Sequence, residues 1–408
     1  MPADPSSSIP SGLTPLCDAS PLRAAETPQL LAYLATITDP RARAGRRHSL
    51  VAILVLAAAA VLAGARSFTA IAEWAADAPQ PVRAALGARR DPLTGRWIWT
   101  VPAESTIRRT LARLDAEALA AVIGAWLAGR DHHRDHHDQR QRPRRAVAVD
   151  GKTLRSARRA TDDRQVHLLA AMDHATRAVL AQQQVGGAPE EVPAFQPLLA
   201  NLDLAGTVVT ADALHTHPAA AEFLVAKQAH YLFTVKANQP TLLDRCAGLA
   251  WHRVPELDRT RDRAHGRVEL RTLKAVSVSR FGFPHAAQVV QVTRKVRDLR
   301  QHNSKRWRTV TVYAITSLTF AQASPARLAD YLRGHWAIEN GLHYIRDVTF
   351  AEDGSQVRTG TGPSVMACLR NLAIGLLSRA GPVNLAAALR HHARDPHRPL
   401  ATLGITLG

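Results

Sequence analysis

The pattern of apolar residues changes at residue 146, and this change constrains the fold most. Before residue 130 the apolar residues recur at helical spacing, whereas after residue 146 short apolar runs alternate with helical segments. The first such run, Ala146–Val149, is followed by Asp150-Gly151, which we interpret as a strand that ends in a turn. Strands that alternate with helices form a sheet with helices on both faces. We therefore expect an α/β fold after residue 146.

Three carboxylates are candidates for one site. Asp150 and Asp212 each follow an apolar run directly, and ligands of open α/β sheets gather at the carboxyl ends of strands. Glu339 shares a helical stripe with Leu328 and Arg346, so we expect it on the half-buried side of a helix. An ion pair with Arg346 or a metal shared with the two aspartates would account for a carboxylate there. The metal would be Mg²⁺ or Mn²⁺, as two ions.

A second cluster of charge lies near residue 110. Ser105 is placed to cap a helix that carries Arg108, Arg109 and Arg113 near its start. This arrangement suits a helix laid on DNA phosphates, although a solvated basic face of a helical bundle would look the same.

Net charge narrows the choice of partner. Lys and Arg total 52 and Asp and Glu 34, which gives a net charge of +18. A charge of this size favours a polyanionic partner such as nucleic acid or an anionic membrane. The longest apolar run, Leu50–Ala65, is shorter than the roughly 18–20 residues that span a bilayer, so we interpret it as a buried helix and expect no membrane. The 3 cysteines lie far apart, which excludes a zinc ribbon and fits a reducing cytoplasm.

These patterns suggest a division of the chain. It comprises a disordered tail (1–26), a helical N-terminal domain for DNA binding (27–130), a basic His/Arg-rich linker (131–145), the first part of the α/β core (146–242), a β-rich insertion (243–323), the second part of the core with the Glu339 helix (324–395) and a C-terminal tail (396–408).

Several stretches resemble one family of proteins. They are Ala148–Arg155, Val209–Thr216, Tyr231–Gln239, His265–Glu269, His335–His343 and Asp347–Asp353, with Asp39–Arg41 and Ser105-Thr106 in the N-terminal part. In this order they resemble the H-repeat-associated (ISAs-type) insertion-sequence transposases over about residues 28–380. The resemblance implies an RNase H-like core, a mixed sheet flanked by helices, with a β-rich insertion and an all-helical N-terminal domain.

It also implies a function. A DDE triad maps onto Asp150, Asp212 and Glu339, which would bind the metal ions and catalyse DNA cleavage and strand transfer. The partners would be the inverted repeats that end the element and a target duplex, held by a homodimer in the bacterial cytoplasm. We assign DNA contacts to Lys152, Arg155, Lys236, Asn238, Tyr331, Arg333, His335, His343 and Arg346, besides the three arginines near residue 110.

Two departures from the family pattern leave alternatives open. A Tyr–Arg–Glu–Lys signature is only approximated around Glu339, and an Asn-Glu pair is replaced by Glu190-Glu191, so a role for Glu191 stays open. A catalytically inactive DNA-binding remnant of an element, or a nuclease of the same fold without strand transfer, remain as alternatives.

Overall fold

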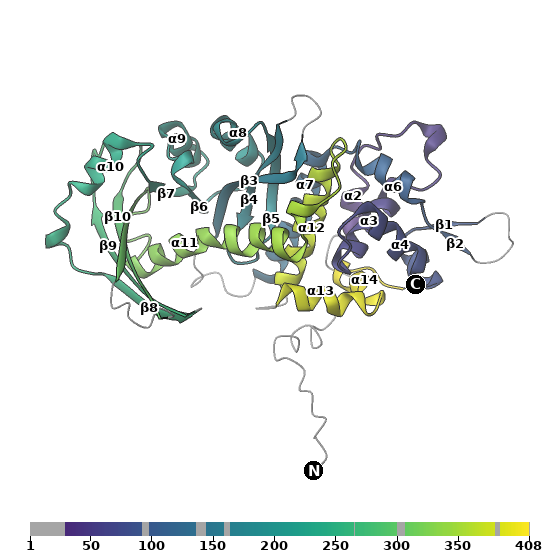
Figure 1. Ribbon diagram of the computed structural model, residues 1–408. Helices are drawn as coiled ribbons and strands as arrows, with labels where there is room; N and C mark the ends of the chain where they lie inside the picture. Colours follow the sequence, from purple (N-terminus) through teal and green to yellow (C-terminus); the bar gives the residue numbers. More distant parts are fainter. Residues whose placement is uncertain are drawn as a thin grey trace, which may run out of the picture.

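A computed structural model describes residues 29–91, 98–135, 144–158, 164–264, 266–299, 307–379 and 384–407. The molecule is elongated, with the N-terminal and C-terminal helices at one end and the strands β8 to β11 at the other (Figure 1). A nine-stranded mixed sheet connects the two ends.

The order of the strands defines the core. Across the sheet they follow β5-β4-β3-β6-β7-β11-β10-β9-β8, where β3, β6 and β7 are parallel and the other neighbours antiparallel. Their bounds are β3 Ala146–Arg158, β4 Gln165–Asp173, β5 Val179–Val185, β6 Val208–Ala211, β7 His230–Val235, β8 Asp258–Ala264, β9 Arg267–Ser277, β10 Gln288–Asp298 and β11 Arg308–Thr316. The first five strands have the order and directions of an RNase H-like core, which confirms the expected fold class.

The β-rich insertion continues the same sheet. Tyr313 of β11 pairs with Val235 of β7, so the four inserted strands extend the core. Leu273 and Val290 of the insertion share a buried cluster with Leu232 of β7 and Leu328 of α11 (Pro325–Ile338). The insertion therefore completes the surface on which α11 packs.

Helices cover both faces of the sheet. On one face lie α8 (Ala188–Ala200), α9 (Pro218–Ala226) and α10 (Pro240–Ala247), and on the other lies α11 (Figure 1). Phe195 of α8 meets Phe233 of β7 edge to face, with 6.2 Å between ring centres. Ser324 caps α11, because its hydroxyl accepts a hydrogen bond from the Arg327 amide.

The N-terminal part is helical, as its spacing predicts. Its elements are α2 (Leu30–Leu34), α3 (Leu50–Leu62), α4 (Phe68–Asp77), α5 (Gln80–Ala85), α6 (Glu104–Leu111) and α7 (Ala116–Asp135), with a short pair β1 (Arg89–Arg90) and β2 (Trp99–Thr100). The apolar run after Ser49 forms α3, which is buried on nearly all sides. No helix in the described ranges is long and apolar enough to cross a membrane.

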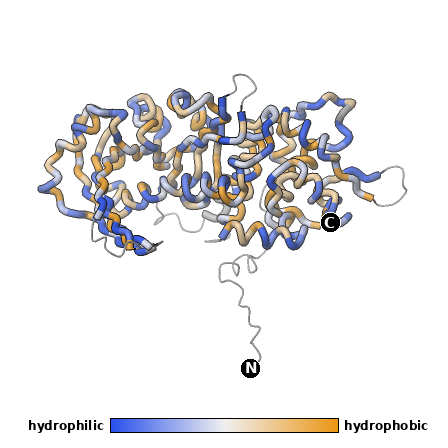
Figure 2. Tube along the Cα trace, in the orientation of Figure 1, coloured by the Kyte–Doolittle hydropathy of each residue, from blue (hydrophilic) through white to orange (hydrophobic). Residues whose placement is uncertain are grey.

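Helix α3 packs against the C-terminal helices α12 (Gly362–Ser378), α13 (Leu385–Ala393) and α14 (His397–Leu403). Orange segments mark these buried stretches in Figure 2, and blue ones gather where β8 and β9 end.

Several local predictions are wrong. Helix α6 begins at Glu104 with Ala103 before it, so Ser105 is not its cap. The helix also ends at Leu111, because the Asp115 carboxylate accepts the Glu117 and Ala118 amides and starts α7 instead. Arg113 therefore lies in the turn between the two helices.

Helices also reach into stretches that we expected to be irregular. Helix α7 continues to Asp135, inside the predicted linker 131–145, and α14 lies inside the predicted tail 396–408. The predicted tail 1–26 and the linker residues 136–143 lie outside the described residues.

Candidate active site

Asp150 does not end its strand, in contrast to the prediction. Strand β3 continues to Arg158 because it stays paired with β4, for example Leu154 with Val166. Its parallel pairing with β6, however, stops at Val149 and Ala211. Asp150 and Asp212 are therefore the next residues after the last paired row, and they lie side by side at the carboxyl end of the parallel strands.

Asp212 is held by the turn that follows it. Its Oδ1 accepts the Leu214 amide at 2.9 Å and so caps the short helix η2 (Ala213–His215). Asn238, which follows β7, donates from Nδ2 to the Ala213 carbonyl at 2.6 Å. The neighbouring strand end thus holds the backbone beside Asp212 in place.

The helix that carries Glu339 changes its winding at that residue. Helix α11 ends at Ile338, and two π-helical segments follow, η4 (Glu339–His343) and η5 (Ile345–Thr349). Such wider turns often occur at functional sites. The change begins at the residue that we assign to the triad.

Alternate residues of β3 contact residues four apart in the π-helical segments. His343 Nδ1 lies 3.5 Å from Asp150 Oδ2, and the Lys152 ammonium lies 2.6 Å from the Asp347 carboxylate. Two strand residues advance roughly 6.6 Å and four residues of an ordinary α-helix roughly 6 Å, so similar steps bring successive pairs together. Asp347, which the sequence analysis quoted only as part of a motif, thus belongs to the site.

Glu339 is more exposed than its stripe predicts, and Arg346 is not its partner. Arg346 Nε lies 2.8 Å from Glu352 Oε2, and Arg370 Nη1 lies 2.7 Å from Glu352 Oε1, with all three side chains buried. The ion-pair explanation for Glu339 is therefore wrong. Within the described residues Glu339 has no ion pair, and its carboxylate remains open to a ligand.

Ionisation of the Asp150 carboxyl is unfavourable in this site. Burial raises the pKa of its carboxyl to about 7, and the nearby charges of Asp212, Glu339 and Glu191 act in the same direction, against a hydrogen bond from the Gly151 amide. Its basic neighbour His343 offsets little of this, because burial holds the pKa of that imidazole well below its usual value. Among the described residues, no lysine or arginine forms an ion pair with any of the three acids.

The donor set fits a hard divalent cation by its chemistry. Carboxylate oxygens are preferred ligands of Mg²⁺ and Mn²⁺, and their mutual repulsion is what a cation would relieve. In the described part of the chain, however, no three acidic, histidine or cysteine side chains are grouped closely enough to hold a metal ion. Metal binding would therefore require the three acids to lie closer together than they do in this structure.

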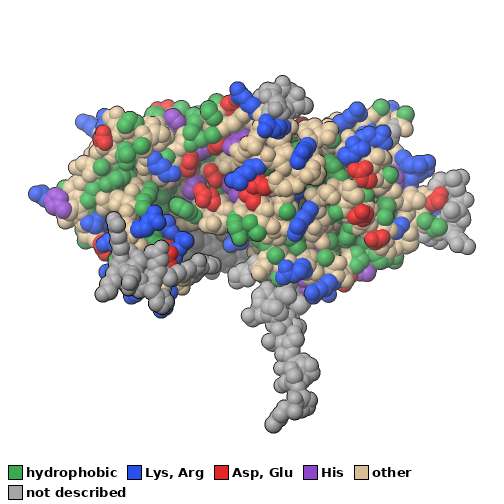
Figure 3. All heavy atoms as spheres, viewed as in Figure 1, with side chains coloured by type: hydrophobic (Ala, Val, Ile, Leu, Met, Phe, Trp, Pro, Cys, Tyr) green, Lys and Arg blue, Asp and Glu red, His purple; other side chains and the backbone are tan. Residues whose placement is uncertain are grey.

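The predicted DNA-contact residues fall into two groups. Those exposed on the surface are Arg108, Arg109, Arg113, Arg155, Lys236 and Asn238. Arg333 is half-buried and ion-paired with Asp330, whereas Lys152 is buried against Asp347. His343 is mostly covered. Figure 3 shows acidic and histidine side chains near the middle of the visible face, with Lys and Arg around them.

For three of these residues the DNA-contact prediction is wrong in this structure. Arg346 is fully buried with Glu352, and the Tyr331 hydroxyl lies inside, donating to the Arg144 carbonyl. His335 lies with its Nδ1 3.2 Å from the Thr210 hydroxyl, and burial lowers the pKa of its imidazole to about 4. These side chains support the site from within, since none of them reaches the surface.

A buried hydrogen-bonded network lies behind the acids. The Glu191 carboxylate lies 2.6 Å from His167 Nε2 and 3.1 Å from His215 Nε2, and His167 Nδ1 lies 2.8 Å from the Thr153 hydroxyl. It connects α8, β3, β4 and η2. The sequence left the role of Glu191 open and did not single out either histidine.

Gly151 is the one local signal of this network. A Cβ atom there would lie 2.3 Å from Glu191 Oε1, so the carboxylate needs a glycine beside Asp150.

Comparison with known proteins places the chain in a family. Residues 141–376 match the family described as "Transposase DDE domain", and residues 31–127 match "DDE_Tnp_1-associated". The chain belongs to the DDE transposase family. This confirms the resemblance found in the sequence and accounts for both the sheet with its acids and the N-terminal helices.

Individual relatives are distant but matched along most of their length. The chain is 25% identical to "Putative transposase YncI" of Escherichia coli O157:H7, covering 85% of this chain and 87% of that protein. It is also 25% identical to "H repeat-associated putative transposase YhhI" of E. coli strain K12, with coverages of 86% and 91%. An uncharacterized protein in the dhlA 3′ region of Xanthobacter autotrophicus is 32% identical over 54% of this chain and 70% of its own length.

Among solved structures, a piggyBac transposase synaptic complex with hairpin DNA is similar at 11% identity. The match covers 92% of this chain and 76% of that chain, with a TM-score of 0.38.

Proposed function

We propose that this member of the DDE family is an active transposase, which cleaves DNA at the ends of an insertion sequence and joins the freed ends to a target duplex in the bacterial cytoplasm. The observation that carries the proposal is the charge at Asp150. Three carboxylates act on one another at the carboxyl end of β3 and β6, and burial with this repulsion raises the pKa of Asp150 to about 7. A site that only stabilised the fold would place a cation there.

In the proposed reaction, water attacks a phosphodiester at the element's end, the bond to the 3′ oxygen breaks, and a 3′-hydroxyl is freed. That hydroxyl then attacks a phosphodiester of the target, joins one strand and releases the target's own 3′ oxygen. Divalent ions held by Asp150, Asp212 and Glu339 would supply charge stabilisation for the attacking and leaving oxygens. The chain itself contributes mainly position and charge.

The roles of individual residues follow from their exposure. Lys236 and Asn238 follow β7 directly and are exposed beside the Asp212 turn, where they would contact the DNA backbone. Arg155 lies further along β3, with 78% of its side chain exposed. Arg108 and Arg109 of α6 would hold phosphates outside the catalytic centre. Because two element ends must be brought together, we expect a homodimer on DNA.

The test is a cleavage and joining assay with the purified chain, a duplex bearing the element's own ends, and Mg²⁺. Asp150→Asn, Asp212→Asn and Glu339→Gln are each expected to lower cleavage at least 100-fold while duplex binding persists. Glu222→Gln is the matched control, since Glu222 is exposed on α9 away from the acids. Full cleavage by any triad variant would contradict the assignment. Cleavage without joining would favour a nuclease, and binding without cleavage an inactive remnant.

A further inference from the structure

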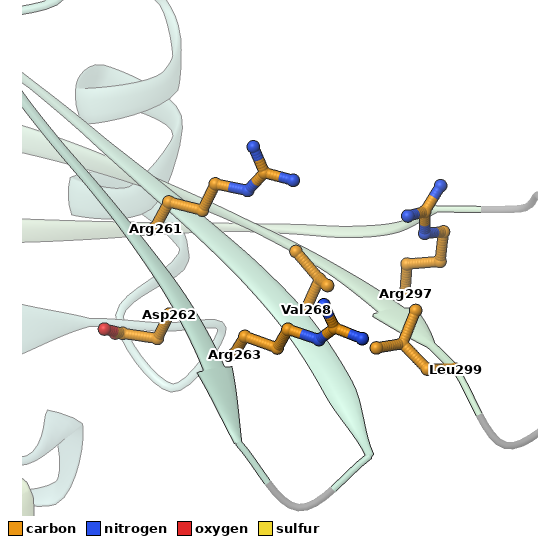
Figure 4. Close-up of a pocket in the computed structure, with 6 residues that line it drawn as sticks. All are labelled: Arg261, Asp262, Arg263, Val268, Arg297 and Leu299. Atoms are coloured by element: carbon orange, nitrogen blue, oxygen red, sulfur yellow. The ribbon is translucent and has the colours of Figure 1, made fainter.

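In the outer part of the sheet, the acidic side chains all lie on one of the two faces. Along β8, arginines at positions 259, 261 and 263 alternate with Asp258, Thr260 and Asp262. Since successive side chains of a strand point to opposite faces, the three arginines share one face and the two aspartates share the other. Figure 4 shows Arg261 and Arg263 pointing to one side and Asp262 to the other.

The register extends this sorting across the neighbouring strands. Arg263 lies opposite Val268, which lies opposite Arg297 of β10, and Arg261 is in the next row with Leu270 and Lys295. The face defined by these rows, which we name the arginine face, carries Arg259, Arg261, Arg263, Lys295 and Arg297 among threonines and apolar residues. The acids of these strands, Asp258, Asp262, Glu269 and Asp298, are all on the opposite face.

The opposite face neutralises its own charges, whereas the arginine face does not. Glu269 is ion-paired with Arg271 and with Arg294 on that opposite face. In the described part of the chain, none of the five cations of the arginine face has a carboxylate partner, and the Nε of Arg297 is buried without a hydrogen-bond acceptor. The Arg297 guanidinium lies 5.3 Å from the centre of the Trp307 ring, which orients it but leaves its charge in place.

The arginine face is also hollowed. A pocket of about 390 Å³ is lined by Arg261, Asp262, Arg263, Val268, Arg297 and Leu299. Strands β8 and β10 are two strand spacings apart, roughly 9–10 Å, so guanidinium groups approach the hollow from two sides (Figure 4). A phosphate could be contacted there by several arginines at once, and guanidinium groups bind phosphate oxygens well.

Protection of a sheet edge does not explain this pattern. Charged residues on an edge strand prevent pairing with other chains, and β8 is such an edge. That purpose is served by either sign on either face, so it does not require arginines on one face and aspartates on the other. A face with five cations and no acid, beside a face on which arginines and acids balance, indicates a ligand of negative charge.

We propose that the arginine face binds the phosphate backbone of duplex DNA, as a contact surface separate from the catalytic acids. This inference rests on the proposed function, which supplies the DNA. A contact made through phosphates carries no sequence information, so binding through this face should not depend on the sequence of the duplex.

The experiment measures binding of a labelled duplex to the full chain between 50 and 300 mM salt, by fluorescence anisotropy. Arg261→Gln with Arg263→Gln should weaken binding about tenfold and lower the slope of log affinity against log salt by about 2, because each lost phosphate contact removes about 0.9. Arg261→Lys with Arg263→Lys should restore the slope, since charge is retained. Arg297→Gln alone should lower it by about 1.

The matched control is Arg271→Gln of β9 with Arg308→Gln of β11, which removes the same amount of charge from the opposite face of the same sheet. This pair should change the slope by less than 1. Equal effects of the two double variants would overturn the inference, because they would reflect net charge alone. An unchanged slope for the Arg261/Arg263 variant would also overturn it.

Two duplexes of equal length, one with the element's end and one unrelated, complete the test. Equal losses on both are expected, and a loss confined to the element's end would overturn a contact made through phosphates. If the unmodified chain binds duplex but the Arg261/Arg263 variant has the same salt slope, this inference fails and the proposed transposase function stands. If the unmodified chain binds no duplex at all, the proposed function fails.

Discussion

At the scale of single residues, Asp150 combines burial with like charge. Its pKa is raised to about 7 from an ordinary value near 3.8, so the folded chain holds a proton that the unfolded chain has already lost between these values. Across this window the folded state binds more protons than the unfolded state, so a rise in pH favours the unfolded state. Stability therefore falls between about pH 4 and pH 7.

Asp150→Asn should therefore stabilise the chain while abolishing cleavage. In metal-free buffer its free energy of unfolding should exceed that of the unmodified chain by up to ~4 kcal/mol at pH 8, and by less at pH 5. Urea denaturation at the two pH values measures this. Glu222→Gln serves as the control, and its difference in unfolding free energy from the unmodified chain should not increase between pH 5 and pH 8. A variant less stable than the parent at pH 8 would contradict the electrostatic account.

The spacing of residues alone selected the candidate acids but did not predict their surroundings. Asp150 and Asp212 were recognised because each follows an apolar run, a local pattern. The partners of Arg346 could not be recognised in this way. A helical stripe relates it to Glu339, whereas packing of α12 brings Arg370 and Glu352 to it instead. The partners of a side chain that is buried between elements are set by how those elements pack. The periodicity of a single segment does not predict this packing.

At the scale of elements, the winding of the segment after α11 depends on the buried Glu352. Its carboxylate accepts from Arg346 in η5 and from Arg370 in α12, and so connects the π-helical segment to a helix whose residues are nearly all buried. The attraction of the two guanidinium groups offsets the desolvation that all three side chains undergo. The position of His343 and Asp347 depends on this connection.

Glu352→Gln should destabilise the chain by about 3–5 kcal/mol, because it leaves two buried guanidinium groups without a counter-charge. The measurement is the free energy of unfolding in urea at pH 7, beside Glu256→Gln, whose side chain is exposed. A loss below about 1 kcal/mol for Glu352→Gln would mean that the cluster is not held by charge.

Element boundaries show where local patterns stop being sufficient. The start of α11 follows a local pattern, since a capping serine, Ser324, is followed by a proline at the first helical position. The end of α6 was missed, since Asp115 starts a new helix inside an unbroken apolar spacing. The length of β3 was missed as well, because its extension depends on pairing with β4 and not on its own residues.

At the scale of the whole molecule, the insertion and the core share one packed layer. Leu273 of β9 is buried in the cluster that also contains Leu328 of α11, the helix that ends directly before Glu339. We therefore expect a substitution that weakens packing in the insertion to disturb the position of the catalytic residues as well.

Leu273→Ala should cost about 2–5 kcal/mol of the free energy of unfolding, through lost burial and the cavity left behind. It should also lower cleavage at temperatures where the unfolded state is not populated, because the support of α11 is weakened. Leu257→Ala is the control, since that side chain is 36% exposed. If Leu273→Ala is destabilising but cleaves at the full rate, the insertion supports folding only.

The sequence by itself determined the helical N-terminal part, the alternating strands and helices after residue 146, and the residue types available for a divalent cation. These follow from local periodicity and from acids placed directly after strands. Only the tertiary structure decided that the insertion joins the core sheet, that Glu191 is held by two histidines, and that Lys152 pairs with Asp347, 195 residues away. Such contacts depend on how distant elements pack, and no pattern within a single element specifies that packing.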